Sequence, residues 1–178
     1  MTRHRLFVAL ALPRPVRSAL IAAMGTVAGA RWQDDAQLHC TVRFLGELDR
    51  HVGEDAAVSL AGIRHPAIPA RIEGVGVFDH GGRIDTLWAG VAPLDALRAF
   101  HAKVDRALIR AGLMADGRAY RPHVTLARFG RGAAPPPGIV ASIALPPLGF
   151  TFAEMRLYES HFGREGALYE VVERYPLG

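Results

Sequence analysis

The sequence is poor in cysteine, in lysine and in long apolar runs. Cys40 is the single cysteine among 178 residues, which excludes a disulfide framework and a cluster of thiolate metal ligands. The apolar run over 6–12 is too short to cross a membrane as a helix. Residues 1–12 have the basic start and apolar run of a signal peptide, but Pro-Arg-Pro follows where a small-residue cleavage site belongs. We therefore expect a first strand here and a cytoplasmic protein.

Arginine supplies almost all of the positive charge. Lys103 is the only lysine beside 20 arginines, and the formal net charge at pH 7 is +4. A surplus of this size does not by itself imply binding to a nucleic-acid duplex. The composition leaves two interpretations open. One is a general bias, since Ala and Gly are also abundant; the other is a phosphate-binding surface, because the guanidinium fork matches phosphate oxygens.

One short pattern occurs twice, each time in an apolar run typical of a strand. The sequence HCTV places His39 two residues before Thr41, and HVTL places His123 two residues before Thr125. Positions i and i+2 of a strand point to the same face. Each pattern therefore presents an imidazole beside a hydroxyl, while the residues between and after them face a core. Cys40 is one of these, so we interpret it as a packing residue and not as a nucleophile.

The remaining segments alternate between strand-like and helix-like patterns. Apolar runs and period-two alternation predict strands, spacings of three and four predict helices, and Gly or Pro marks their ends. We expect 68–78 and 84–91 to pair as a hairpin, with a bulge or bend near Gly74 and Gly76. The pattern predicts strands over 5–12, 37–48, 68–78, 84–91, 122–129, 149–158 and 167–175, helices from 16 and over 54–63 and 93–111, a loop over 130–138 and a turn over 163–166.

This order of elements repeats itself. Residues 5–47 and 84–130 each comprise a strand, a helix, a connecting segment and a histidine strand. We infer a diverged duplication within a single domain over 1–178, with too few copies for a solenoid. Two such lobes facing each other bring both motifs onto the walls of one cleft.

Two imidazoles across a cleft suit general acid–base catalysis, because an ordinary pKa of about 6.5 lets one be neutral while the other is protonated. The threonine hydroxyls can donate to non-bridging phosphate oxygens, and Arg128 adds positive charge. The alternative is that the pattern lies on the surface of two amphipathic strands and has no function.

The other histidines lie at expected termini, turns or helix surfaces and are assigned to solvent: His4, His51, His65, His80, His101 and His161.

The paired motifs resemble the two-histidine phosphoesterase superfamily. Within it the chain is similar to the bacterial and archaeal RNA 2′,3′-cyclic phosphodiesterases, the LigT-like 2′-5′ RNA ligase family. The similarity covers nearly the whole chain: 5–9 resembles the family's first strand, 87–91 its mid-chain strand, and 166–169 with 175–177 its C-terminal segment. The resemblance implies an α+β fold of two pseudo-symmetric lobes, whose antiparallel sheets line a central cleft with helices on the outside.

The resemblance also implies roles for the motif residues. His39 matches the general acid that protonates the leaving 3′ oxygen, and His123 matches the general base that activates water. Thr41 and Thr125 match the residues that hold the phosphate.

Two further residues extend this predicted site. Arg128 matches an arginine that binds phosphate, and Phe44, at the same offset in the first motif, is a candidate surface for stacking a base. Regular strand alternation puts the side chains of Arg128 and Phe44 on the face that points away from their histidines. A bulge or a strand end is therefore needed to turn these two side chains into the cleft. Arg43, by the same alternation, lies on the strand face of His39 and Thr41, and its side chain either contacts phosphate or lies in solvent. For His161, a contact with substrate is the alternative to solvent, because its loop can overhang the cleft.

The main hypothesis is metal-independent hydrolysis of RNA 2′,3′-cyclic phosphate termini to 2′-phosphomonoesters, with 2′-5′ RNA ligation as a side activity. It implies RNA ends or small cyclic nucleotides as partners, a monomer, and no membrane, metal or cofactor. The residues leave open a phosphodiesterase acting on 2′-5′ oligonucleotides or on an ADP-ribose cyclic phosphate, and a non-catalytic module that binds RNA ends. A mononuclear zinc site is disfavoured because two histidines lack a third ligand pattern nearby.

Overall fold

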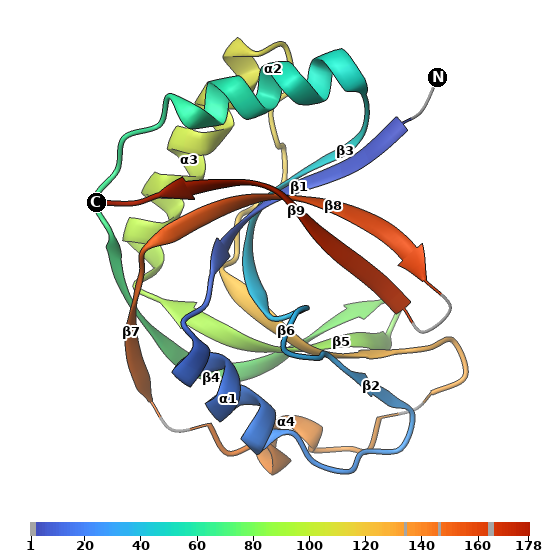
Figure 1. The fold of residues 1–178 in the computed structure, drawn as a ribbon. Helices are drawn as coiled ribbons and strands as arrows, with labels where there is room; N and C mark the ends of the chain where they lie inside the picture. Colours follow the sequence, from blue (N-terminus) through green and yellow to red (C-terminus); the bar gives the residue numbers. More distant parts are fainter. Residues whose placement is uncertain (1–2, 134, 146, 164–165) are drawn as a thin grey trace.

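The computed structural model describes residues 3–133, 135–145, 147–163 and 166–178. Figure 1 shows its helices and strands. The helices are α1 (Arg14–Ala23), α2 (Arg50–Ala61), α3 (Leu94–Arg110) and the short α4 (Ile139–Ser142). The strands are β1 (Arg3–Ala11), β2 (Ala30–Trp32), β3 (His39–Asp49), β4 (Ile68–His80), β5 (Arg83–Ala92), β6 (His123–Phe129), β7 (Leu148–Phe152), β8 (Glu154–Gly163) and β9 (Gly166–Pro176).

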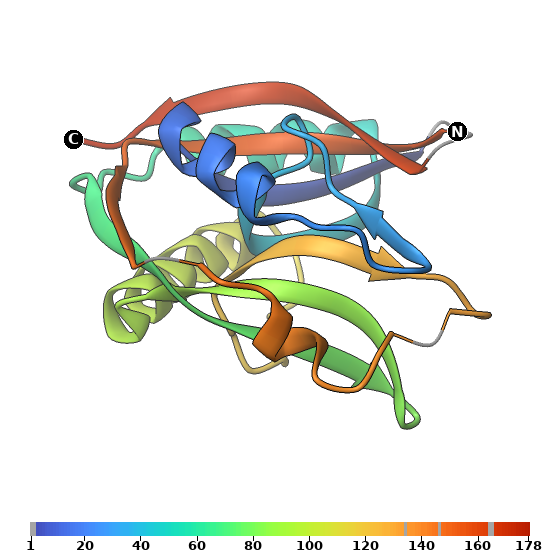
Figure 2. The same cartoon turned by 90° about the horizontal axis from the view of Figure 1, so that it is seen from below.

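The strands form two antiparallel halves joined at one seam. Their order is β7-β4-β5-β6-β3-β1-β8-β9, and β2 pairs with β6 beside this path. We call β3, β1, β8 and β9 the first half-sheet, and β7, β4, β5 and β6 the second. At the seam between β3 and β6 the register pairs Cys40 with Val124. Figure 2 shows the β8–β9 and β4–β5 hairpins at opposite sides of the molecule. The predicted α+β class with antiparallel sheets is confirmed.

Helix α3 shows why the predicted helices form where they do. Leu97, Phe100, Val104 and Leu108 recur at helical spacing and are fully buried. Gly112, two residues past the end of the helix, has a φ of 90°, a conformation that glycine adopts without a steric penalty. Helices α2 and α3 pack on each other and on strands of the first half-sheet. They bury one face of that half-sheet and leave its other face to the cleft.

Strand β1 is buried on both of its faces. Leu6, Val8 and Leu10 belong to the main core, while Phe7 and Ala9 point the opposite way and pack with Tyr158 in a smaller cluster. A strand covered on both sides needs a continuous apolar sequence, and this explains the run from which the first strand was predicted.

One predicted strand is wrong in its extent. Residues 149–158 form two strands, β7 and β8, which separate at Ala153. Strand β7 pairs with β4, whereas β8 pairs with β1, so the chain passes from the second half-sheet to the first at this residue. The apolar alternation continues across the break because both strands have a buried face.

Other boundaries differ less. Helix α2 begins at Arg50, before the predicted start at 54, and neither β2 nor α4 was predicted. The hairpin of β4 and β5 forms with a register shift between Ile72 and Val75, as the two nearby glycines suggested. The predicted loop over 130–138 and the turn over 163–166 contain residues 134 and 164–165, which lie outside the described residues.

The two proposed repeats contain equivalent pairings. Strands β1 and β3 are antiparallel neighbours on either side of α1 in the chain, and β5 and β6 are antiparallel neighbours on either side of α3. The origin of this arrangement by duplication stays a prediction.

Within the described ranges, no helix is both long and apolar enough to cross a membrane.

Candidate active site

The seam between the half-sheets brings both motifs together. Because Cys40 pairs with Val124, continuing that register places His39 beside Thr125 and Thr41 beside His123. All four side chains line one cavity of about 780 Å³. The intervening residues face the main core, as predicted, and burial raises the pKa of Cys40 to about 12. Cys40 is therefore a packing residue held as a thiol.

A bulge follows the threonine in each motif. In β3, Thr41 pairs with Ala9 and Arg43 with Val8, which leaves Val42 as the extra residue. Each bulge reverses the parity of the residues after it, so Phe44 points into the cavity with 48% of its surface exposed.

The second motif has its bulge at the same offset. In β6, Thr125 pairs with Trp88 and Ala127 with Leu87, which leaves Leu126 as the extra residue. Arg128 consequently lines the cavity as well. The bulges required to bring Phe44 and Arg128 inward are therefore present in both strands.

Arg43 has neither of the two roles expected for it. The bulge at Val42 turns its side chain toward α3, where it is only 5% exposed. There its Nη1 lies 2.6 Å from Asp105 Oδ1, and its Nη2 donates to the carbonyl of Met114. Arg43 is thus a buried, paired cation, and the expectation of a phosphate contact or a solvated side chain was wrong.

His161 also lies apart from the two motif histidines. Its Nε2 is 3.3 Å from Glu170 Oε2, across the β8–β9 hairpin. It is absent from the described lining of the cavity, although Ser160 and Phe162 on either side of it take part. The hairpin reaches the cleft, but through these neighbours.

His39 is enclosed by aromatic rings. The ring centroids of Phe7 and Tyr169 lie 5.0 and 5.2 Å from that of His39, and Tyr158 stacks on Phe7. The Nε2 atom is 3.1 Å from Thr41 Oγ1, while Nδ1 has no hydrogen-bond partner among the described residues. Burial lowers the pKa of His39 to about 4, and the positive charge of nearby groups adds to the effect. At neutral pH this ring is uncharged.

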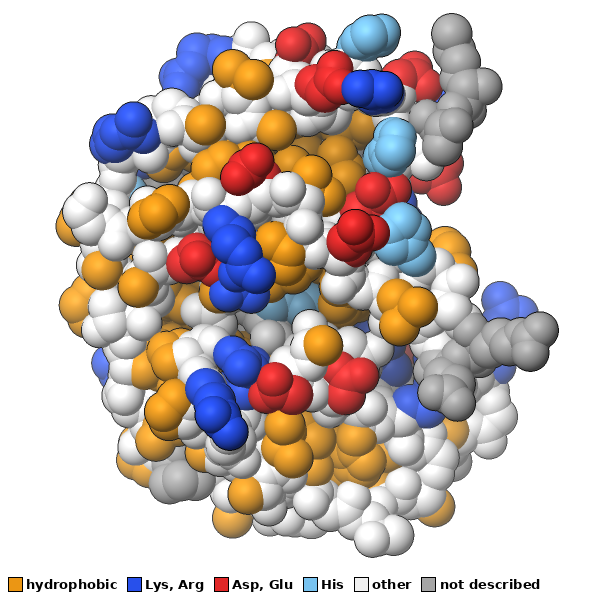
Figure 3. All heavy atoms as spheres, in the orientation of Figure 1, with side chains coloured by type: hydrophobic (Ala, Val, Ile, Leu, Met, Phe, Trp, Pro, Cys, Tyr) orange, Lys and Arg blue, Asp and Glu red, His pale blue; other side chains and the backbone are white. Residues whose placement is uncertain are grey.

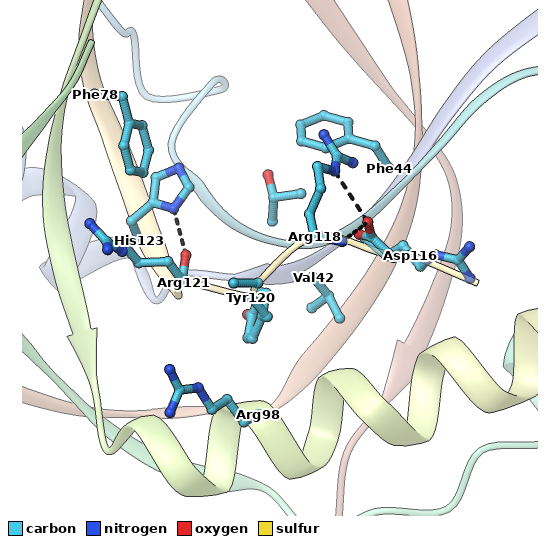
Figure 4. Close-up of a pocket in the computed structure, with 12 residues that line it drawn as sticks. Val42, Phe44, Phe78, Arg98, Asp116, Arg118, Tyr120, Arg121 and His123 are labelled. Carbon is cyan, nitrogen blue, oxygen red and sulfur yellow. Dashed lines mark hydrogen bonds and ion pairs between the residues drawn. The ribbon is translucent and has the colours of Figure 1, made fainter. Parts of the chain in front are cut away.

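His123 is held in a defined tautomer by the hydrogen bond to Arg121 that is drawn in Figure 4. Its Nδ1 lies 2.7 Å from the carbonyl oxygen of Arg121, which only accepts hydrogen bonds, so Nδ1 carries the proton. The neutral ring therefore keeps an unprotonated Nε2. Phe78 packs edge-on at 4.9 Å between ring centroids. Burial, with the charges of Arg128 and Arg121, lowers the pKa of His123.

The cavity is strongly basic. Arg5, Arg31, Arg118 and Arg128 line it, and none of its described lining residues is acidic. Arg31 and Arg128 are direct neighbours across the β2–β6 pair, an unfavourable placement for two cations unless an anion lies between or above them. Over the face drawn in Figure 3, by contrast, acidic and basic side chains are interspersed. The arginines thus concentrate positive charge where the two histidines meet.

Comparison with known proteins places this geometry in a family. The model of the 2′-5′ RNA ligase superfamily matches residues 12–164. The protein belongs to the 2′-5′ RNA ligase superfamily. Among its relatives, the RNA 2′,3′-cyclic phosphodiesterase of Escherichia coli is 32% identical, with 98% of this chain and 97% of the relative covered. The enzyme of the same name from Thermus thermophilus is 31% identical, with 97% and 90% covered.

Solved structures of other proteins share the fold of this superfamily member. The crystal structure of E. coli LigT complexed with 3′-AMP superposes with a TM-score of 0.79 at 24% identity, covering 99% of each chain. The T. thermophilus protein TT0787 superposes with a TM-score of 0.77 at 27% identity, covering 97% of each chain.

Several residues of this candidate site were missed in the sequence. Arg5 and Arg31 lie in short or terminal segments without a motif, and Tyr158 and Tyr169 reach His39 only through the pairing of β8 with β1 and β9. The one signal available in the sequence was the strand alternation of β8 and β9, because it implied that their aromatic residues lie on a second face of these strands.

Among the described residues, no group of three or more His, Cys, Asp or Glu side chains is placed to hold a metal ion.

Proposed function

We propose that the protein hydrolyses RNA 2′,3′-cyclic phosphate termini to 2′-phosphomonoesters by metal-independent acid–base catalysis. The observation that carries the proposal is the convergence of His39 and His123, each with its threonine, in one cavity whose charged lining is arginine. Two relatives at 31% and 32% identity are named as RNA 2′,3′-cyclic phosphodiesterases, which supports this substrate class.

The proposed reaction uses the two histidines in opposite protonation states. Neutral His123 takes a proton from water at Nε2 as the water oxygen bonds to phosphorus. The bond from phosphorus to the 3′ oxygen breaks, and protonated His39 gives its proton to that oxygen. The products are a 2′-phosphomonoester and a free 3′ hydroxyl.

The remaining residues stabilise charge on the phosphate. Thr41 and Thr125 donate hydrogen bonds to the non-bridging oxygens, and Arg128 adds a guanidinium at the rim of the same cavity. Phe44, exposed beside them, offers an aromatic face on which the terminal base stacks. The anionic phosphate also favours protonation of His39, which burial of the imidazole opposes.

The identity of the product tests this function. We expect the purified protein to convert adenosine 2′,3′-cyclic phosphate to adenosine 2′-phosphate alone, at the same rate with and without EDTA. The 3′ isomer as product would contradict the assigned direction of ring opening, and loss of activity in EDTA would contradict metal independence. Product analysis by chromatography or ³¹P NMR distinguishes the two isomers.

A substrate panel separates the alternatives. Higher kcat/KM on 2′-5′-linked oligonucleotides or on an ADP-ribose cyclic phosphate than on RNA-terminal cyclic phosphates would reassign the substrate. Saturable binding of all of them without turnover would identify a module that binds RNA ends.

The lowered pKa values predict an acidic pH optimum. Activity falls at low pH when the base becomes protonated, and falls at high pH when the acid loses its proton. The pKa values of both His39 and His123 are below 6.5 in the free protein. The bell-shaped curve of kcat/KM against pH therefore has its maximum below pH 6.5, whichever histidine is the acid. We expect kcat/KM at pH 8 to be at least about tenfold below its maximum. A plateau extending above pH 7.5 would contradict this prediction.

A further inference from the structure

A second cavity opens beside the first and extends the cleft past the histidines. It has a volume of about 430 Å³ and shares Thr41, Phe44, Phe78, Arg118 and His123 with the main cavity. We call it the side pocket. Figure 4 shows its residues, which come from β3, β4, β6, helix α3 and the segment that leads into His123. Because the two cavities meet at His123, a ligand that reacts in the main cavity can continue into the side pocket.

The side pocket carries positive charge of its own. Arg98 on α3 and Arg121 line it but not the main cavity, and neither makes an ion pair with any described residue. The one carboxylate in its lining, Asp116, already accepts hydrogen bonds from the backbone and Nε of Arg118. Two guanidinium groups are therefore available to an anionic ligand.

Aromatic rings lie beside two of the arginines. The guanidinium of Arg121 lies 5.9 Å from the ring centroids of both Phe78 and Trp88, and that of Arg118 lies 5.9 Å from the centroid of Phe44. An arginine that stacks by its flat face keeps its N–H edges for phosphate oxygens. Phe78 also lines the side pocket, and its ring is a flat surface for a nucleobase.

We propose that the side pocket binds the nucleotide on the 5′ side of the reacting terminus, with Arg98 and Arg121 on its phosphodiester. This inference rests on the proposed function. A terminal 2′,3′-cyclic phosphate is the last phosphate of its strand, so the only neighbouring nucleotide lies on the 5′ side. The side pocket, at about 430 Å³, is within the usual size range of small-ligand sites. The preferred substrate is accordingly an oligoribonucleotide end, and a cyclic mononucleotide fills only the main cavity.

The test compares two substrates with the same reacting end. We would measure kcat/KM for a cyclic-phosphate mononucleotide and for a dinucleotide that ends in the same nucleotide and cyclic phosphate. The wild-type protein is expected to prefer the dinucleotide by about tenfold or more, and Arg98→Ala to lower that preference by about fivefold. For the dinucleotide, the slope of log kcat/KM against log salt concentration should become shallower in Arg98→Ala by about 0.7, the value for one lost phosphate contact on a single strand.

Arg106→Ala is the matched control. Arg106 is an exposed arginine on the same helix and is absent from the described lining of both cavities, so its substitution should leave the substrate preference and the salt slope unchanged. Equal kcat/KM for the two substrates in the wild-type protein, or the same preference in Arg98→Ala as in wild type, would overturn the proposal.

A binding measurement keeps this inference distinct from the proposed function. The affinities of the mononucleoside 2′-phosphate and the corresponding dinucleotide 2′-phosphate are compared for wild type and Arg98→Ala. If neither cyclic substrate is hydrolysed, the proposed function fails, while tighter binding of the dinucleotide that depends on Arg98 still supports the side pocket. Equal affinities would overturn the side pocket even in an active enzyme.

Discussion

Replacing His123 with alanine is expected to lower kcat/KM for a 2′,3′-cyclic nucleotide by about 10³-fold, within the range that a positioned general base contributes. The hydrogen bond from Nδ1 to the carbonyl of Arg121 leaves Nε2 as the ring's only acceptor, and alanine removes it. The matched control is His161→Ala, which removes a histidine that pairs with Glu170 and lies outside the described cavity lining. Full activity in His123→Ala would contradict the mechanism.

His39→Ala should cause a loss of similar size, but for a different reason, and a modified substrate separates the two. When the bridging 3′ oxygen is replaced by sulfur, the leaving thiolate needs no proton. We expect His39→Ala to recover most of its activity on this substrate and His123→Ala to recover none. The opposite pattern would exchange the roles of acid and base. Unchanged circular dichroism spectra and melting temperatures would show that both variants fold.

The buried ion pair behind the first motif is expected to give the largest effect on stability. Asp105 forms an ion pair with Arg43 and accepts a hydrogen bond from the backbone N–H of Asp116, and Arg43 is only 5% exposed. Asp105→Ala leaves a buried guanidinium without its counterion, so the free energy of unfolding should fall by about 3–5 kcal/mol. Urea denaturation followed by circular dichroism measures this change.

Two further variants test whether the charge is the cause. The double variant Arg43→Met with Asp105→Leu removes both charges and should recover most of the lost stability. Glu54→Ala breaks an exposed pair with Arg50 and should leave the urea midpoint unchanged. A double variant as unstable as Asp105→Ala would show that packing around α3, and not the uncompensated charge, accounts for the loss.

The sequence was sufficient to predict the elements whose pattern is local. The strands with His39 and His123, the β4–β5 hairpin and helix α3 all follow from periodicity and from Gly or Pro at their ends. The convergence of the four motif residues also follows once two similar halves are assumed to face each other.

Features that depend on strand pairing could not be predicted. The boundary between β7 and β8 at Ala153 is set by their different partners, β4 and β1, and no breaker residue marks it. Strand β2 has three residues and exists only through its pairing with β6. The parity of Arg43 was misjudged because the bulge at Val42 is an apolar residue in an apolar strand, without glycine to indicate it.

The path of the chain between the half-sheets has a consequence for folding during synthesis. Strands β4, β5 and β6 are consecutive and pair with one another, so they can assemble soon after they leave the ribosome. Strand β1 must wait for β8, since Leu6 pairs with Glu159 near the other end of the chain, and contacts of such sequence separation form slowly. A nascent chain that ends after β6 therefore carries both histidines, yet Tyr158 and Tyr169 have not been made. The aromatic enclosure of His39 is therefore completed only when the last hairpin closes over its ring.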